Sequence, residues 1–268
     1  MDLAAFATPG LRAGQSEADG VGPPCGGAYL ALMTRTILRV SGPDQARFLQ
    51  GLLTRDVPEA GLGYAALLTP QGKYLADFLT WQDAEAAYLD VDAGLAGSLA
   101  RRLAMYKLRS KVEIAEAEIT VSRGTGAAPE GAMADPRPGM GWRGYDVGAD
   151  DVTDWDAVRV ENVIPETGIE LIPEESYILE MGFERLGGVD FRKGCYVGQE
   201  VTARMKHKTE LRKGLARVRG AVSPGAAITA GGRAIGTVHT VSGDRALAYL
   251  RFDRAEGMET EAGPLALD

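Results

Sequence analysis

Residues 193–200 read KGCYVGQE, in which a cysteine and an aromatic residue lie between two glycines. Gly194 and Gly198 permit tight turns on both sides, so the segment predicts a short, stiff, exposed loop that carries Cys195. The adjacent Lys193 would favour the thiolate form of the cysteine electrostatically. Cys195 is therefore a candidate reactive thiol, and the competing interpretation is a small hydrophobic side chain buried in the core.

This loop begins the most basic part of the chain, residues 192–219. Nine basic and two acidic residues give the segment a charge of +7, although the whole chain carries −8. Such an island indicates a local anion site or, more simply, a solvated face. The candidate anion-binding residues are Arg204, Lys206 and Lys208. Gln199 and Glu200 open a possible helix to residue 204, whose N-terminal amides would also attract an anion.

The region before the motif alternates strands with helices. Runs of β-branched and aromatic residues predict strands, and apolar stripes behind Pro43 and Asp92 predict helices. The sequence TPQG at residues 69–72 suits a turn that joins two strands in a hairpin. We expect strands at residues 36–40, 64–69, 74–81, 86–91, 111–115 and 118–122, and helices at 43–51, 92–106, 154–162 and 176–186.

The region after the motif has a different pattern. Strand-like segments at residues 214–219, 226–229, 234–241 and 245–252 are separated by glycine, proline and aspartate, with no helical stripe. This pattern predicts a small closed or nearly closed β unit of about 55 residues. We expect an α+β protein with three parts: a flexible tail at residues 1–32, a main region at 33–208 and a β-barrel at 209–268.

Composition excludes several classes of protein. The chain has 268 residues, of which 45% are hydrophobic, and no apolar run long enough to span a bilayer. Its two cysteines, Cys25 and Cys195, are too few for a disulfide scaffold or a zinc site, so we expect no bound metal. The first residues resemble neither a secretory signal nor a mitochondrial presequence, which predicts a cytoplasmic location without membrane contact.

Two carboxylates have no clear interpretation from the residues alone. Asp77 interrupts an apolar strand, YLADFLTW, and Glu161 lies near the end of an expected helix. Each is either a solvent-facing side chain or a residue placed at a site.

The sequence KGCYVGQE resembles the signature of the YgfZ family of folate-binding iron–sulfur maintenance proteins, which are relatives of the aminomethyltransferase (T-protein) of the glycine cleavage system. The signature residues present are Lys193, Gly194, Cys195, Tyr196, Gly198, Gln199 and Glu200. Further similar stretches lie at residues 35–57, 66–78, 106–114, 164–173 and 184–208, so the resemblance extends from about residue 35 to the end of the chain.

The resemblance implies a fold, a ligand and partners. The fold would be T-protein-like, with folate-binding domains followed by a C-terminal antiparallel β-barrel, and the ligand would be tetrahydrofolate or a derivative. Arg159 and Glu161 match the T-protein sequence in which the glutamate binds the pterin, a role that suits a carboxylate accepting two N–H bonds. The partners would be iron–sulfur client or assembly proteins, including enzymes that modify tRNA.

Two departures from the T-protein put aminomethyl transfer in doubt. Only Asp77 remains of two adjacent acids that the T-protein has, and Cys195 stands where the T-protein has an acid. The leading hypothesis is therefore a folate-binding accessory factor in which Cys195 acts transiently or as one cluster ligand. The alternative is a folate-dependent one-carbon transferase with Asp77 as its acid or base. Direct nucleic-acid binding is not expected, because the basic island lacks interleaved aromatic residues.

Overall fold

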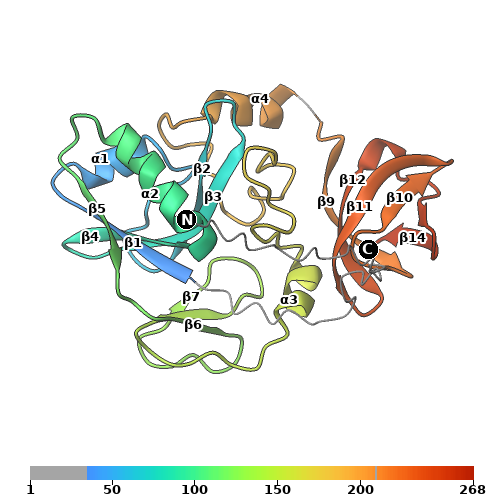
Figure 1. The fold of residues 1–268 in the computed structure, drawn as a ribbon, viewed down its shortest axis with the longest axis horizontal. Coiled ribbons are helices and arrows are strands. Elements are labelled where there is room, and N and C mark those ends of the chain that lie inside the picture. Colours follow the sequence, from blue (N-terminus) through green and yellow to red (C-terminus); the bar gives the residue numbers. More distant parts are fainter. Residues whose placement is uncertain (1–34, 209) are drawn as a thin grey trace, which may run out of the picture. The chain divides into compact units, whose positions relative to one another are not determined.

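The computed structural model describes residues 35–208 and 210–268, and the expected tail at residues 1–32 lies outside this range (Figure 1). A five-stranded antiparallel sheet has the order β2-β3-β4-β1-β5. Its strands are β1 (Arg35–Ser41), β2 (Gly63–Leu68), β3 (Tyr74–Gln82), β4 (Ala86–Asp92) and β5 (Glu113–Ala117). The first four agree with the predicted strands to within one residue at each end, whereas β5 begins and ends two residues later than predicted.

The β2–β3 hairpin is buried on both faces. All six residues of β2 are buried, as are the first seven of β3. Because side chains alternate along a strand, Ala65 and Phe78 join one core cluster, whereas Tyr64 and Leu79 join a second on the opposite face. Asp77 is paired with Ala66, which belongs to the second cluster. The acid in the apolar strand therefore points into the protein.

Two helices pack on the first cluster. These are α1 (Gln45–Gln50), which contributes Phe48 and Leu49, and α2 (Ala93–Lys107), which contributes Leu99 and Leu103. The predicted cap of α2 is confirmed, since the Asp92 carboxylate accepts from the Gly94 amide at 2.8 Å. Among the described residues, no helix is long and apolar enough to cross a membrane.

The segment between the sheet and the barrel contains a three-stranded sheet and two more helices. The strands are β6 (Val121–Gly124), β7 (Met133–Ala134) and β8 (Trp142–Tyr145), and the helices are α3 (Trp155–Asn162) and α4 (Gln199–Lys208). The predicted helix at residues 176–186 is wrong. These residues form successive turns, because Gly182 has φ +78° and ends the helical path. They still fill the second cluster with Ile178 and Phe183.

The predicted barrel is confirmed as closed, with the strand order β10-β11-β12-β9-β14-β13. Its elements are β9 (Lys213–Gly220), β10 (Ala227–Ala230), β11 (Arg233–Ser242), β12 (Arg245–Arg251), η1 (Phe252–Arg254), β13 (Glu259–Thr260) and β14 (Gly263–Leu267). Val218, Ile228 and Val238 are fully buried in its interior. By contrast, Leu215 and Leu247 join the second cluster, so the barrel shares a core with the preceding region.

Candidate functional site

The Cys195 loop is held rigidly and leaves its cysteine outside. Cys195 is exposed and free, whereas the next residue, Tyr196, is only 6% exposed. Gly198 has φ +84°, and a Cβ there would lie 2.6 Å from the carbonyl oxygen of Thr69. Gly198 also lies against Gly72 of the β2–β3 turn. The loop therefore packs by backbone contact on the turn that precedes Asp77, and the predicted exposed loop is what the structure contains.

Lys193 anchors this loop to the end of α1. Its Nζ donates to the carbonyl oxygens of Gln50 (2.9 Å) and Leu53 (2.6 Å) and lies 3.0 Å from Oδ1 of Asp56. Burial lowers the pKa of Lys193, and the bonded Asp56 partly opposes that shift. Because all three N–H donors of the ammonium have partners, its role is to fix the loop rather than to activate Cys195.

The basic island is largely neutralised within α4 and its surroundings. Arg204 pairs with Glu200 at 2.6 Å, and Lys206 pairs with Glu184 at 2.5 Å. Gln199 donates to the Gly194 carbonyl at 3.4 Å. The side chain of Lys208 lies outside the described part of the chain. The structure thus places the predicted anion-binding residues in local ion pairs or beyond what it describes.

Asp77 lies at the centre of a hydroxyl network. It is 8% exposed and accepts from the hydroxyls of Tyr64 (2.9 Å), Tyr74 (2.7 Å) and Thr167 (2.8 Å). Burial, reinforced by the Asp77 charge, raises the pKa of both tyrosines well above the usual range, so they remain donors. The three bonds fix the carboxylate in place, and no lysine or arginine of the described residues forms an ion pair with it.

A ring of arginines surrounds a small cavity at Asp77. The cavity measures about 20 Å³, which is room for about one water molecule. The charged residues that line it are Arg35, Asp77, Arg123, Arg137, Arg143, Arg159 and Glu166. Such a concentration of guanidinium groups is costly to bury unless each has an anionic partner.

Two carboxylates behind the ring neutralise three of these arginines. Asp90 lies 2.6 Å from Nε of Arg35, and Asp135 lies 2.7 Å from Arg137 and 3.3 Å from Arg143. Burial alone would raise the pKa of Asp135, but the two guanidinium groups hold it below its usual value. Asp135 therefore stays charged, and the ion pairs of both carboxylates hold the ring in place.

Arg123 is the exception in the ring. Within residues 35–208 and 210–268, its guanidinium makes no ion pair or side-chain hydrogen bond, and it lies over the ring of Trp155 with 4.0 Å to the centroid. Burial and the nearby Arg143 charge lower the pKa of Arg123 to about 10. The cavity therefore presents one cation, Arg123, and one anion, Asp77, that have no ion-pair partner in the part of the chain that the structure describes.

The two predicted folate ligands point in different directions. Arg159 lines the Asp77 cavity, 2% exposed, and pairs with Glu166 at 2.8 Å and with the buried Glu170. Glu161 does not line the cavity. It is exposed and bridges Arg217 (3.1 Å) and Arg245 (2.6 Å) of the barrel. The helical spacing of α3 separates these two side chains.

The structure thus brings Asp77 and Arg159 together and leaves Cys195 and Glu161 elsewhere. Sequence reasoning missed four arginines of the ring, namely Arg35, Arg123, Arg137 and Arg143. Arg35, Arg123 and Arg143 reach the cavity from the paired strands β1, β6 and β8, and Arg137 reaches it from the connection between β7 and β8. No local signal identifies them.

Comparison with known proteins identifies the family. The chain is 33% identical to "Iron-sulfur cluster assembly factor IBA57, mitochondrial" of Homo sapiens over an alignment of 307 residues. That alignment covers 94% of this chain and 86% of the human protein. The mouse protein of the same name is also 33% identical, with 91% and 82% covered. The chain belongs to the CAF17/IBA57 family of iron–sulfur cluster assembly factors. A family model described as the CAF17 C-terminal β-barrel domain matches residues 212–268.

The fold of this CAF17/IBA57 member matches that of the T-protein. The crystal structure of the glycine cleavage system aminomethyltransferase T from Bartonella henselae superposes with a TM-score of 0.62 at 13% identity, covering 87% of this chain and 82% of that one. The predicted T-protein-like fold with a C-terminal barrel is confirmed. The resemblance to YgfZ is refined, because the relatives carry the IBA57 name and YgfZ is a related branch.

The predicted cytoplasmic location is contradicted by the same relatives. The human, mouse and Phaeosphaeria nodorum proteins are all named as mitochondrial. The prediction rested on a scarcity of cysteines and on a missing targeting pattern. Scarce cysteines fit any reducing compartment, and the first 34 residues lie outside the described structure. Neither observation could separate the cytosol from an organelle interior.

Proposed function

We propose that this assembly factor acts through Cys195, as one thiolate ligand of an iron–sulfur cluster whose other ligands come from a partner protein. The observation that carries the proposal is an exposed free thiol on a loop that Lys193 and Gly198 anchor on either side. The described residues contain no group of three His, Cys, Asp or Glu side chains that could hold a metal. Because clusters normally take four thiolates, Cys195 needs ligands from elsewhere.

The test replaces Cys195→Ala and, as a matched control, Cys25→Ala. In cells that lack their own copy of this factor, the first variant should fail to restore the activity of cluster-dependent enzymes, whereas the control should restore it. Circular dichroism and thermal unfolding confirm that both variants fold. If a folded Cys195→Ala protein fully restored the activity of the cluster-dependent enzymes, the thiol would not be needed for the function and the proposal would be wrong.

The same proposal includes tetrahydrofolate at the Asp77 cavity. The donor set suits the pterin of this ligand, since Asp77 and Glu166 can accept its N–H bonds and Arg123 can donate to its carbonyl oxygen. The volume of about 20 Å³ is smaller than a pteridine ring, so the lining segment at residues 164–167 would move on binding. When bound, tetrahydrofolate supplies a carrier for one-carbon units.

Anaerobic calorimetry with tetrahydrofolate tests this part of the proposal. Asp77→Asn and Arg123→Gln should weaken binding by about tenfold or more each, because each removes a charged hydrogen-bond partner of the ligand. Glu161→Ala tests the residue that the T-protein resemblance implies, and a loss confined to that variant would move the site to the barrel side of α3. If the wild-type protein gave no heat of binding, this protein would have the fold without this ligand.

A one-carbon transferase is the second candidate function. It is favoured by the buried carboxylate of Asp77, which three hydroxyls hold at a fixed position. Turnover of a methylamine donor with tetrahydrofolate, lost in Asp77→Asn, would support it. Among the clients of the assembly factor we also include cluster-dependent tRNA-modifying enzymes, on the resemblance of residues 193–200 alone, and modified tRNA levels in the variant cells test that choice.

A further inference from the structure

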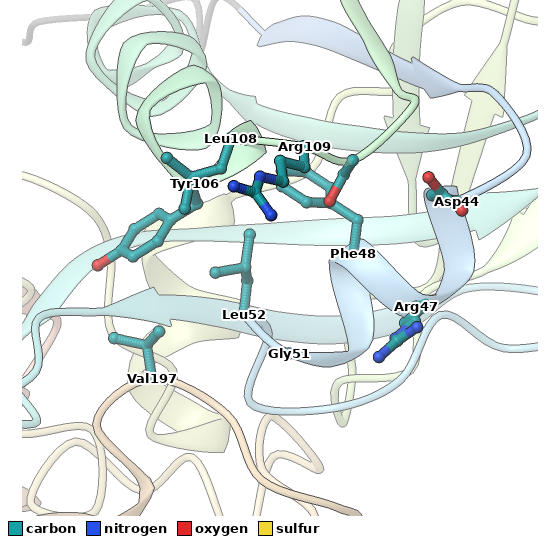
Figure 2. A pocket seen from close by; sticks show the side chains of 10 residues that line it. Asp44, Arg47, Phe48, Gly51, Leu52, Tyr106, Leu108, Arg109 and Val197 are labelled. Atoms are coloured by element: carbon teal, nitrogen blue, oxygen red, sulfur yellow. The ribbon is translucent and has the colours of Figure 1, made fainter.

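A groove of about 1050 Å³ lies between the α1 segment, the C-terminal end of α2 and the Cys195 loop (Figure 2). Its apolar lining residues are Phe48, Leu52, Tyr106, Leu108 and Val197. Figure 2 shows Tyr106, Leu108 and Arg109 together at the end of α2, with Leu52 below them and Val197 on the loop below Tyr106. The groove is far larger than the Asp77 cavity and is open to solvent, so it suits a polypeptide segment better than a small molecule.

The rim of this groove is positively charged. Arg47 and Arg109 line it and have no acidic partner within the described ranges 35–208 and 210–268. The single lining carboxylate, Asp44, accepts from the Lys111 amide at 2.7 Å. On a chain with a net charge of −8, two unpaired guanidinium groups beside an apolar floor complement a segment that is acidic and apolar.

Leu108, which lines the groove, is both exposed to solvent and strained in its backbone. Its side chain is 89% exposed, and its backbone has φ +39° and ψ −101°, a conformation that favours glycine. Met105, one turn earlier on α2, is 73% exposed. A large apolar residue that is both strained and exposed gains nothing in the isolated chain, and such strain is concentrated where another molecule binds.

The groove is also connected to Cys195. Val197 lines it two residues after the cysteine, and Lys193 bonds the carbonyl of Gln50 at the end of α1. A polypeptide seated in the groove would therefore reach the exposed thiol. We propose that the α1–α2 groove is the docking site for an acidic, apolar segment of the protein that shares a cluster with Cys195; this rests on the proposed function.

The probe is a fluorescein-labelled decapeptide in which two leucines are flanked by aspartates and glutamates. Fluorescence anisotropy with the full chain should give saturable binding that weakens as salt is added. A peptide with lysine in place of the acids, or with serine in place of the leucines, should bind at least about tenfold more weakly. Equal binding of the three peptides, or no saturation, would overturn the proposal.

Variants locate the binding on the protein. The pair Arg47→Glu and Arg109→Glu should weaken binding by about tenfold or more, while Arg101→Glu, an exposed cation of α2 that does not line the groove, should leave it unchanged. Leu108→Gly should weaken binding yet unfold at the same or a higher temperature, because it relieves the strained backbone. A structural role alone would move both quantities together.

Two further measurements distinguish the docking proposal from the proposed function of the thiol. Cys195→Ala should bind the acidic peptide normally even though it fails in cells, so loss of the thiol function would leave this proposal standing. Conversely, the arginine pair should keep an exposed, reactive Cys195 but lose cluster-enzyme activity in cells. The remaining alternative is that a second copy of this chain occupies the groove, and light scattering on the free protein tests it. A dimer that the arginine variants abolish would assign the groove to a second copy and overturn the proposal.

Discussion

Cys195 combines exposure with a rigid setting. Lys193 and Gly198 hold the loop on either side, whereas the thiol itself has no cover within the described structure. We predict that iodoacetamide labels the residue 195 peptide in the native protein as completely as in urea, because no unfolding is needed to reach the sulfur. Peptide mass spectrometry measures this, with Cys195→Ser as the blank. Labelling that requires urea would contradict the exposed loop.

Tyr64 and Tyr74 give the interior a signature at alkaline pH. Burial and the Asp77 charge raise the pKa of both phenols in the folded chain, whereas the unfolded chain ionises them near pH 10. Stability is therefore complete below about pH 10 and declines as the pH rises toward the folded values. Absorbance at 295 nm should show these two tyrosines ionising together with loss of circular dichroism. Their titration near pH 10 in a folded protein would contradict the network.

Asp77 shows why the candidate site was only partly predictable. The sequence marked it as an acid in an apolar strand, but its burial depends on the β2–β3 hairpin having no solvent face. Arg123 and Arg143 reach the same cavity from strands of another sheet, and isolated arginines give no periodic signal. Local motifs located the Cys195 loop, therefore, while a site assembled from distant strands required the fold.

At the scale of elements, the Cys195 loop offers a matched pair of glycines. Gly198 has φ +84°, and a Cβ would meet a backbone carbonyl at 2.6 Å, whereas a Cβ on Gly194 would meet nothing within 4 Å. Gly198→Ala should lower the free energy of unfolding by about 1–3 kcal/mol, and Gly194→Ala should change it by less than about 0.5 kcal/mol. Urea denaturation measures both. Equal effects would place the strain elsewhere in the motif.

The elements themselves were predicted best where one local signal dominated. Turn glycines and strand alternation specified the barrel strands β9 to β12, and Asp92 specified the start of α2. The predicted helix at residues 176–186 failed because its apolar residues fill a core beside the sheet without helical periodicity, with Gly182 in a left-handed conformation. The two-residue strands β7 and β13 carry too few residues for any pattern, and the five-residue strand β14 was not predicted.

At the scale of the whole molecule, two glutamates join the α3 region to the barrel. Glu170 is 3% exposed and accepts from the Thr240 hydroxyl of β11 at 2.6 Å while it also binds Arg159. Glu161 makes the equivalent link at the surface, where it pairs with Arg217 and Arg245. Glu170 thus reaches the barrel through a hydrogen bond while its buried ion pair is with Arg159, whereas Glu161 reaches the barrel through exposed ion pairs. Substitution of each glutamate therefore compares a buried ion pair with a solvated one.

Glu170→Gln should cost about 3–5 kcal/mol of unfolding free energy, because it leaves the buried Arg159 guanidinium without its full counter-charge. Glu161→Gln should cost less than about 1 kcal/mol, since water and salt already screen that pair. Thermal unfolding of both variants measures this contrast. Added salt should reduce the cost of Glu161→Gln, because it screens the exposed pair, and should leave the cost of Glu170→Gln unchanged. If Glu170→Gln unfolded in two separate steps, with the barrel melting apart, the buried carboxylate would be what makes the barrel and the arginine ring fold as one unit. A single transition at the wild-type temperature would instead assign that coupling to the shared apolar core around Leu215 and Leu247.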